Sequence, residues 1–168
     1  LVLDGTAGLG EDAWLLSCLG HCVLAVERHP AVFALLRDAW ASAGVLSPWR
    51  ARRIRPVKGD TRSLLEDMIG QAGPGWGCLP RPDVVYLDPM FPSHEQRKTA
   101  ERKSLRLLRS VVGQQVEDPE LLKLALAAAR DRVVVKRPLK APFFARSECA
   151  PVHQVFGRSV RFDVYPKT

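Results

Sequence analysis

The sequence predicts an α/β fold: a mostly parallel sheet with helices on both faces and an antiparallel strand pair at the C-terminal end. Two observations lead to this prediction. Up to about residue 136, short apolar runs typical of buried strands alternate with segments of helical apolar spacing. This alternation is typical of a parallel sheet. Beyond that point, two strand-like segments follow each other with no helix between them, which favours an antiparallel pair.

The first half of the chain contains three expected strands, at residues 1–4, 22–26 and 54–58. Helices are expected at residues 11–19, at residues 30–43 and from about residue 63 onward. Gly20 and Gly44 would end the first two helices, and Pro30 suits the first turn of the second. Ser63 and Glu66 have the spacing of a capping box, which favours a third helix start.

The second half is expected to contain strands at residues 83–87, 132–136, 152–156 and 160–165. Residues 70–82 are rich in glycine and proline and predict a surface loop. Residues 93–117 are rich in arginine and lysine and lack a clean apolar period. Asp118 followed by Pro119 is a strong helix start, and that helix should run to about Arg130.

The composition is that of a globular domain with an excess of basic residues. Of 168 residues, 46% are apolar and 26% are charged, and 25 basic against 18 acidic residues give a net charge of +7. No apolar run approaches the roughly 18–20 residues of a membrane span, so we expect a cytosolic protein with no membrane association. A basic excess favours polyanionic partners such as nucleic acids. Because the chain opens directly on a strand, we expect a short N-terminal segment to precede the single domain of residues 1–168.

Cysteines and histidines are not spaced as metal ligands. The four cysteines include no C-x-x-C pair, and the four histidines show no metal-ligand spacing. We therefore predict no metal site, and we expect buried free thiols at Cys18, Cys22, Cys78 and Cys149.

A glycine-rich turn after the first strand predicts a nucleotide site. Residues 4–10 read Asp-Gly-Thr-Ala-Gly-Leu-Gly, and such glycines let the chain turn sharply and let a ligand approach the backbone. Glu27 ends the next strand, where a carboxylate can accept the ribose hydroxyls of an adenosine. The turn departs from the dinucleotide pattern because Ala13 stands where a third glycine is needed. Glu11 and Asp12 would repel a pyrophosphate but not a sulfonium or ammonium group, which favours S-adenosyl-L-methionine over NAD.

The fourth strand ends in a motif suited to the methylation of an amine. Residues 84–91 read Val-Val-Tyr-Leu-Asp-Pro-Met-Phe, which resembles the Asp-Pro-Pro-Tyr-type motif of methyltransferases acting on exocyclic amines of bases. Such an amine is a poor nucleophile because its lone pair is delocalised into the ring. The Asp88 carboxylate and the Pro89 carbonyl can accept hydrogen bonds from its two N–H groups and stabilise the positive charge that develops on its nitrogen. Phe91 would stack on a base taken out of its helix.

Five blocks of sequence together resemble one family, the ribosomal RNA small subunit methyltransferase J family. They span nearly the whole chain in order: residues 4–12, 27–30, 84–92, 132–138 and 161–165. The resemblance implies a Rossmann-like class I methyltransferase fold with S-adenosyl-L-methionine as the cofactor. It also implies methyl transfer to N2 of a guanine in small-subunit ribosomal RNA, with that RNA or the 30S particle as partner.

The expected site residues follow the ends of the strands. The catalytic residues would be Asp88, Pro89 and Phe91. The glycine turn and the resemblance together place cofactor contacts at Asp4, Gly8, Gly10, Glu11, Asp12, Glu27, Arg28, Asp60, Thr61 and Asp88.

Basic residues at the same edge of the sheet are the expected RNA contacts. One group follows the Asp-Pro-Met-Phe segment and the other follows the fifth strand: Arg97, Lys98, Arg102, Lys103, Lys136 and Arg137. If the two groups converge, they form a phosphate-binding rim around a flipped base. A solvated charged face is the alternative interpretation.

Three other functions remain open from the sequence. The first is an adenine-N6 or other nucleic-acid amino-methyltransferase, which the methylated nucleoside would identify. The second is an NAD(P)-binding oxidoreductase on the same fold, and the third is an RNA-binding module without catalysis. The sequence does not predict an oligomeric state.

Overall fold

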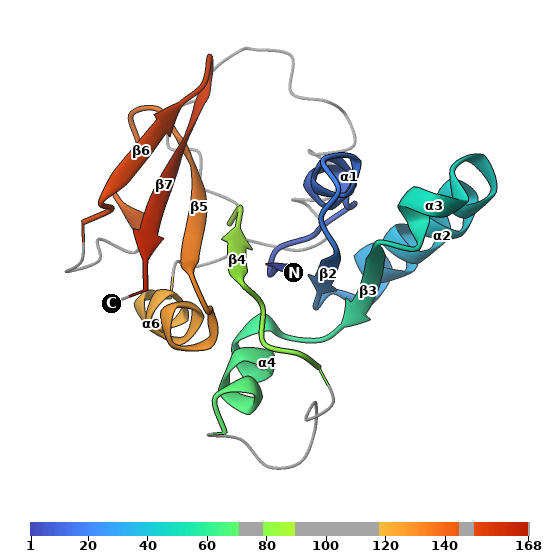
Figure 1. The fold of residues 1–168 in the computed structure, drawn as a ribbon, viewed down its shortest axis with the longest axis horizontal. Coiled ribbons are helices and arrows are strands. Elements are labelled where there is room, and N and C mark those ends of the chain that lie inside the picture. The colour runs from blue at the N-terminus through green and yellow to red at the C-terminus, as the bar shows by residue number, and fades with distance from the viewer. Residues whose placement is uncertain (71–78, 90–117, 145–149, 168) are drawn as a thin grey trace.

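The computed structural model describes residues 1–70, 79–89, 118–144 and 150–167. Within these residues the fold is a seven-stranded sheet with the strand order β3-β2-β1-β4-β5-β7-β6 (Figure 1). The strands are β1 (Val2–Asp4), β2 (Val23–Glu27), β3 (Ile54–Lys58), β4 (Val84–Leu87), β5 (Arg132–Pro138), β6 (His153–Phe156) and β7 (Val160–Pro166). The strands from β3 to β5 in this order pair in parallel, and β7 pairs antiparallel with both β5 and β6. The predicted sheet, including its antiparallel end, is confirmed.

Helices cover both faces of the sheet, as the alternation of elements predicts. One layer holds α1 (Glu11–Cys18), α2 (Pro30–Leu46) and the short α3 (Pro48–Ala51), and the other holds α4 (Thr61–Met68) and α6 (Pro119–Ala128) (Figure 1). Gly44 was expected to end α2, but the helix continues to Leu46. This longer α2 and the one-turn α3 that follows it were not predicted.

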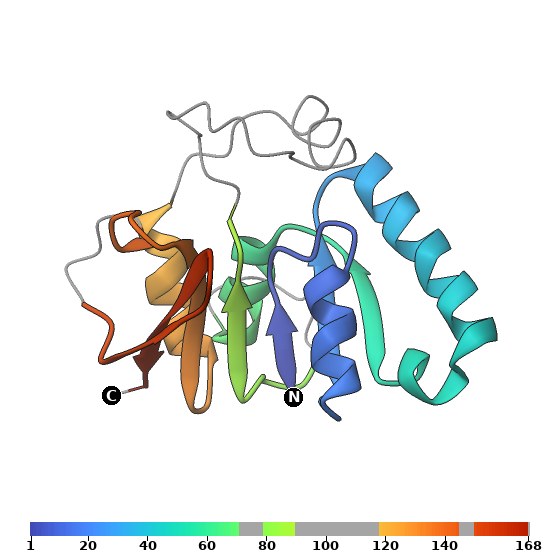
Figure 2. The same ribbon diagram turned by 90° about the horizontal axis from the view of Figure 1, so that it is seen from above.

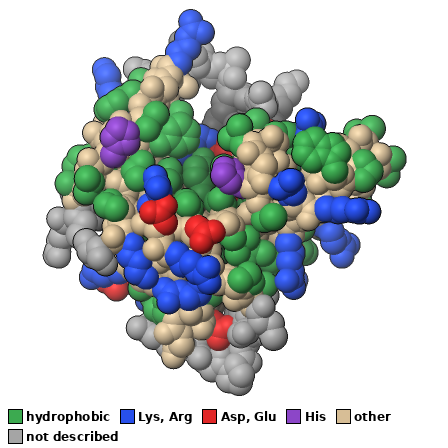
Figure 3. Space-filling view, viewed as in Figure 1, with side chains coloured by type: hydrophobic (Ala, Val, Ile, Leu, Met, Phe, Trp, Pro, Cys, Tyr) green, Lys and Arg blue, Asp and Glu red, His purple; other side chains and the backbone are tan. Residues whose placement is uncertain are grey.

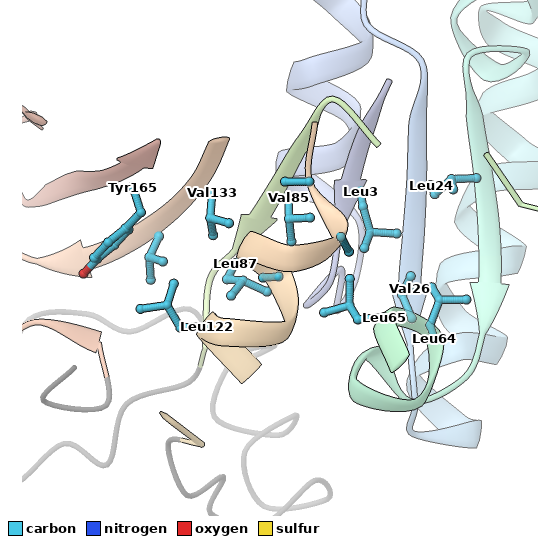
Figure 4. Close-up of a cluster of buried hydrophobic side chains, with 14 of the residues drawn as sticks. Leu3, Leu24, Val26, Leu64, Leu65, Val85, Leu87, Leu122, Val133 and Tyr165 are labelled. Atoms are coloured by element: carbon cyan, nitrogen blue, oxygen red, sulfur yellow. The ribbon is translucent and has the colours of Figure 1, made fainter. Parts of the chain in front are cut away.

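The core lies mainly between the sheet and the layer of α4 and α6. Leu3, Val85 and Leu87 from the central strands pack there against Leu65 of α4 and Leu122 of α6 (Figure 4). These side chains are at most 2% exposed. Burying a leucine side chain of this kind contributes about 1.5–3 kcal/mol, so this layer holds the central strands rigidly in place.

A smaller core on the opposite face seats the first helices. Ala13 of α1 and Leu36 of α2 pack there against Val23, Ala25 and Ile54 of the sheet. Because α1 follows the glycine turn directly, this packing fixes the direction in which the turn leaves β1.

Helix N-termini agree with the predictions in one case and differ in another. Asp118 caps α6, since its side chain accepts the backbone N–H of Glu120 at 2.9 Å. At α4 the cap is Asp60, which accepts the N–H groups of Arg62 and Ser63. The helix therefore starts earlier than Ser63, and the capping-box match there was wrong. A single oxygen, Asp60 Oδ1, thus satisfies two of the free N–H groups of the first turn.

Two cysteines contradict the expectation of buried thiols. Cys18 and Cys22 are free, as predicted, but exposed, because α1 ends and the next strand begins at the rim of the sheet. Cys78 and Cys149 lie outside the described residues. Among the described helices, none combines the length and the apolar composition needed to cross a bilayer.

The carboxyl ends of the parallel strands share one edge of the sheet (Figure 2). The connection from β1 to α1 lies at this edge. The strand bounds place Glu27 at the end of β2, Asp60 after β3 and Asp88 after β4 at the same edge. This is the edge at which parallel sheets bind ligands.

Candidate active site

The glycine turn between β1 and α1 is tied to the two strands beside β1. The Gly5 N–H donates to the carbonyl of Tyr86 in β4 at 2.9 Å, and the Ala7 N–H donates to the carbonyl of Val26 in β2 at 3.0 Å. Gly8 and Gly10 have φ angles of +53° and +83°, which glycine adopts more readily than other residues. The turn is therefore a rigid loop held across three strands.

The turn is less crowded at Gly8 than at Gly5. Among the described residues, a Cβ added at Gly8 would meet no atom closer than 3.9 Å, whereas one added at Gly5 would lie 2.7 Å from Thr61 Cγ2. The Thr61 hydroxyl donates to the Gly5 carbonyl at 2.5 Å and is buried. Thr61 thus supports the turn from behind. Within the described residues, the Gly8 side of the turn is its more open side.

Glu27 lies next to this open side. One of its carboxylate oxygens accepts the Gly8 N–H at 3.1 Å and the other accepts the His29 N–H at 2.6 Å. The carboxylate is thereby fixed at the end of β2 beside the turn, where the sequence predicts it. Arg28 and Glu11 are exposed at the same edge, and neither position is contradicted as a cofactor contact.

Asp88 lies against the glycine turn. Its backbone N–H donates to the Thr6 hydroxyl oxygen at 2.6 Å, and the Thr6 N–H donates to the Asp4 carboxylate at 3.1 Å. The motif at the end of β4 and the turn after β1 are distant in sequence but form one site, because β1 and β4 are adjacent parallel strands. Pro89, which follows Asp88, is buried.

A lysine joins two carboxylates at this point. Lys136 of β5 places its Nζ 2.8 Å from Asp12 Oδ2 and 2.9 Å from Asp88 Oδ2. The Tyr86 hydroxyl also donates to Asp12 Oδ2, at 2.7 Å. Side chains from α1, β4, β5 and the end of β4 thus form one hydrogen-bonded network.

Two carboxyl groups of the site, those of Asp4 and Asp88, have raised pKa values. Burial of Asp4, reinforced by the nearby charges of Asp12 and Asp88, raises its pKa from 3.8 to about 7. Partial burial also raises the pKa of Asp88, although the adjacent Lys136 ammonium opposes that rise. Burial alone would lower the pKa of Lys136, but the carboxylates of Asp88 and Asp12 outweigh it, and the pKa is raised. Lys136 is therefore a cation at neutral pH.

The structure corrects one of the expected RNA contacts. Arg137 is fully buried and donates to the carbonyl oxygen of Pro142 at 2.6 and 3.0 Å. It faces the interior because it shares a face of β5 with the buried Val133 and Val135, so it cannot reach a phosphate in solvent. Its neighbour Lys136 points to the opposite face and into the site.

Several other predicted residues have a structural role or lie outside the description. Asp60 is exposed and caps α4, and Asp4 is buried beneath the turn. Phe91 and the expected RNA contacts that follow it all lie outside the described residues: Arg97, Lys98, Arg102 and Lys103.

Three participants were missed by the sequence interpretation: Thr6, Tyr86 and Lys136 as a partner of carboxylates. Thr6 and Tyr86 lie within the motifs quoted above, so their positions next to the glycines and to Asp88 were the available signal. No local pattern indicates that Lys136 reaches Asp12, because the two residues are 124 positions apart.

The residues of the site fit S-adenosyl-L-methionine. The carboxylates of Asp12 and Asp88 suit a cationic group, and Glu27 suits the hydroxyls of a ribose. The same carboxylates would repel a pyrophosphate. In the described part of the chain, no group of three or more His, Cys, Asp or Glu side chains is placed to hold a metal ion.

Comparison with known proteins gives a family match over almost the whole chain. The model of the family described as putative SAM-dependent methyltransferases matches residues 1–167. A protein of Pseudomonas aeruginosa named ribosomal RNA small subunit methyltransferase J is 43% identical over 99% of this chain. A protein of the same name from Pseudomonas fluorescens is 41% identical. The chain spans about 60% of the length of these curated relatives.

Solved structures agree with this match. A SAM-dependent methyltransferase from Neisseria gonorrhoeae is 34% identical, has a TM-score of 0.74 and covers 99% of this chain and 64% of its own. A glycopeptide N-methyltransferase in complex with S-adenosylmethionine has a TM-score of 0.51 at 18% identity, with 94% of this chain and 49% of its own covered. The second likeness shows the fold alone. The class I methyltransferase fold predicted from the sequence is thus confirmed.

Proposed function

Because the chain belongs to the family of putative SAM-dependent methyltransferases, we propose that it transfers a methyl group from S-adenosyl-L-methionine to N2 of a guanine in small-subunit ribosomal RNA. The RNA substrate is supported by the name of the relatives that are 41–43% identical. The guanine amine is the target that the sequence resemblance implies. Residues 1–168 are proposed to form the methyltransferase domain of this activity.

One observation carries the proposal: Asp88 is hydrogen-bonded to the glycine turn. Its backbone N–H donates to Thr6 at 2.6 Å, so the carboxylate that would hold the amine lies next to the loop that would hold the cofactor. Glu27 is fixed on the other side of the same loop. Methyl transfer needs the nucleophile and the methyl group in line at close range, and this arrangement brings their binding groups together.

Each residue then has a defined task. Bound S-adenosyl-L-methionine supplies an electrophilic methyl group on a positively charged sulfur. Glu27 would bind the ribose, and the backbone at Gly8 would lie against the cofactor. The Asp88 carboxylate and the Pro89 carbonyl would accept hydrogen bonds from the two N–H groups of the exocyclic amine. These bonds would orient its lone pair and stabilise the positive charge that develops on nitrogen. The amine then loses one proton, to Asp88 or to water.

The charge of the protein is consistent with an RNA partner. The chain has a net charge of +7, and Lys and Arg side chains are prominent on the face shown in Figure 3. Basic surfaces bind nucleic acids through the release of counterions. We propose small-subunit RNA, free or in the 30S particle, as the partner, and the cytosol as the place of action.

The alternatives from the sequence differ in their support. The family match favours a methyltransferase over an NAD(P)-binding oxidoreductase or a module without catalysis. An adenine-N6 methyltransferase stays a competing hypothesis, because Asp88 and the Pro89 carbonyl would hold either amine.

The test is transfer of a tritiated methyl group to small-subunit RNA and to 30S particles, followed by digestion and identification of the labelled nucleoside. We expect N2-methylguanosine, and N6-methyladenosine or no label on either substrate would contradict the proposal. Asp88→Asn should lower kcat by about 10²–10³-fold, because it replaces a charged acceptor at the reacting amine.

The matched control is Asp131→Asn. Asp131 is exposed, lies directly before β5 and pairs with Arg132, so its replacement should leave kcat within about twofold of the original value, as surface changes do. Equal activity of the Asp88 and Asp131 variants would refute the role assigned to Asp88. Titration with S-adenosylhomocysteine checks that the Asp88 variant still binds the cofactor product.

A further inference from the structure

Lys136 is largely buried and lies between two carboxylates, which is unusual for a lysine. It follows Val135, which pairs with Leu87 in the sheet, so it lies beside Asp88 at the carboxyl edge. Its side chain is 23% exposed, and its Nζ contacts Asp12 and Asp88 at 2.8 and 2.9 Å. The ammonium therefore bridges the start of α1 and the end of β4.

We propose that Lys136 is a positioning residue of the methyl-transfer site, which holds the Asp88 carboxylate ionised and in place beside the glycine turn. This inference rests on the proposed function and adds a residue to it. It replaces the role of phosphate contact that the sequence suggested for Lys136.

The charges around Lys136 explain why such a residue is needed. The charges of Asp12 from α1 and of Asp88 after β4 raise the pKa of Asp4 in β1, and the charge of Asp12 also raises the pKa of Asp88. Asp12 is held on a second side by the Tyr86 hydroxyl. Lys136 opposes both of these charge effects, because its ammonium lowers the pKa of Asp4 and of Asp88.

Ionisation of Asp88 matters for the reaction. A carboxylate offers only acceptor sites to the amine, whereas a protonated carboxyl places a donor toward it and cannot stabilise positive charge on nitrogen. Partial burial raises the pKa of Asp88, and the contact with Lys136 lowers it. Loss of the ammonium should therefore move the ionisation of Asp88 to higher pH.

A phosphate contact at Lys136 predicts a different result. Its removal would raise the KM for RNA and reduce the slope of log K against log salt by about one, with kcat unchanged. A positioning role predicts a lower kcat and an altered pH profile at saturating RNA. The two roles can thus be separated in one set of measurements.

The experiment compares Lys136→Met, Lys136→Gln and Lys136→Arg in the full chain, with Lys123→Met as the control. Lys123 is exposed on α6 and contacts Glu120. In the Met and Gln variants, the midpoint of the acid limb of the kcat–pH profile should move to higher pH by about one unit or more. The Arg variant keeps the positive charge and should show little of that shift, and the control should keep the original limb. An unshifted limb in the Met and Gln variants would overturn the proposal.

A second readout does not need activity. Carbon-13 NMR of labelled aspartate carboxyl groups, with the Asp88 signal identified by its loss in Asp88→Asn, gives the ionisation midpoint of Asp88 directly. The midpoint should be higher in Lys136→Gln than in the original chain, and higher than in Lys136→Arg. Equal midpoints would refute the role of Lys136. If the original chain transfers no methyl group, the proposed function fails, while the NMR result still decides whether Lys136 controls Asp88.

Discussion

At the scale of single residues, the site combines groups that stabilise the fold with a buried carboxyl group that destabilises it when ionised. Thr6 and Thr61 use their hydroxyls to join the glycine turn to Asp88 and to the start of α4. Asp4 is 1% exposed and lies beneath the same turn. A buried carboxyl group is unfavourable when ionised, so the pH at which the protein works affects its stability through Asp4.

Asp4 should make the protein less stable as the pH rises from about 4 to 7. Burial raises its pKa to about 7 in the fold, so the folded state keeps a proton that the unfolded chain, with a pKa near 3.8, has already lost. The free energy of unfolding therefore falls across this window, by up to about 4 kcal/mol for a shift of this size. Urea unfolding at several pH values measures the slope.

The variant Asp4→Asn should flatten this dependence. Asparagine keeps an oxygen that can accept the Thr6 N–H, as Asp4 does now, but it does not ionise. We expect the variant to be more stable than the original chain above pH 7. An unchanged slope between pH 4 and 7 would contradict the assignment to Asp4.

Gly10 should tolerate a side chain less well than another glycine of similar backbone conformation. Gly10 and Gly20 have φ angles of +83° and +95°, so alanine costs about 1–2 kcal/mol of backbone strain at either position. A Cβ at Gly10 would also lie 2.6 Å from Leu36 Cδ1, whereas no atom of the described residues lies within 4 Å of one at Gly20. Leu36 is buried, so it has little room to move.

Urea unfolding and titration with S-adenosylhomocysteine separate the two effects. We expect Gly20→Ala to lose stability without losing affinity, and Gly10→Ala to lose more stability and at least roughly tenfold in affinity, since 1.4 kcal/mol is a factor of ten. Equal affinities in the two variants would show that the turn adapts to the added methyl group.

At the scale of elements, an ion pair between Arg62 and Asp118 joins the starts of α4 and α6. Asp60 caps α4 and Asp118 caps α6. Arg62 in the first turn of α4 contacts Asp118 Oδ2 at 2.8 Å. Asp118 therefore caps its own helix and pairs with the neighbouring one.

Replacing Asp118 by alanine should cost about 1–2 kcal/mol of stability. Most of this loss comes from the cap, whose removal typically costs about 1 kcal/mol. The ion pair with Arg62 is half-exposed and adds little, as surface pairs do. Urea unfolding of Asp118→Ala and Asp118→Asn tests this division, because asparagine keeps the cap and removes the charge. A loss in the asparagine variant as large as in the alanine variant would assign the energy to the ion pair.

At the scale of the whole molecule, a buried polar cluster joins the antiparallel end of the sheet to the connection after β5. Arg161 of β7 pairs with Asp163 at 2.9 Å and donates to the carbonyls of Pro138 and Leu139. Arg137 stands opposite Arg161 in the sheet register. Asp163 compensates the charge of Arg161, while the Arg137 guanidinium donates to the carbonyl of Pro142.

The variant Arg161→Met should lose about 3–5 kcal/mol of stability, because it leaves the buried Asp163 without its charged partner. That is a large part of the 5–15 kcal/mol typical of a domain. Thermal and urea unfolding would measure the loss, with the exposed Arg158→Met as a control that stays within about 0.5 kcal/mol. The double variant Arg161→Met, Asp163→Leu should recover part of the loss. A double variant no more stable than Arg161→Met would show that packing, not charge, accounts for it.

Local patterns in the sequence were sufficient for the strands, most helices and the edge at which the site lies. Apolar period, glycine and proline positions and the Asp118 cap depend on neighbours within a few residues, and parallel strands bring their carboxyl ends together. The sequence therefore placed Glu27 and Asp88 correctly, at the edge formed by the carboxyl ends of the parallel strands. The cap at Ser63 and the end of α2 were wrong because several short patterns compete at a helix end, and packing decides between them.

Only the tertiary structure decided that the Lys136 side chain faces the site and the Arg137 side chain is buried. Both are basic, adjacent and at the end of β5, so the sequence assigned them the same role. Neighbouring residues of a strand point to opposite faces, and β7 and the connection after β5 bury the face of Arg137, while Asp12 and Asp88 meet the face of Lys136. These partners are distant in sequence, and no local pattern encodes which of two adjacent cations faces the interior and which faces the site.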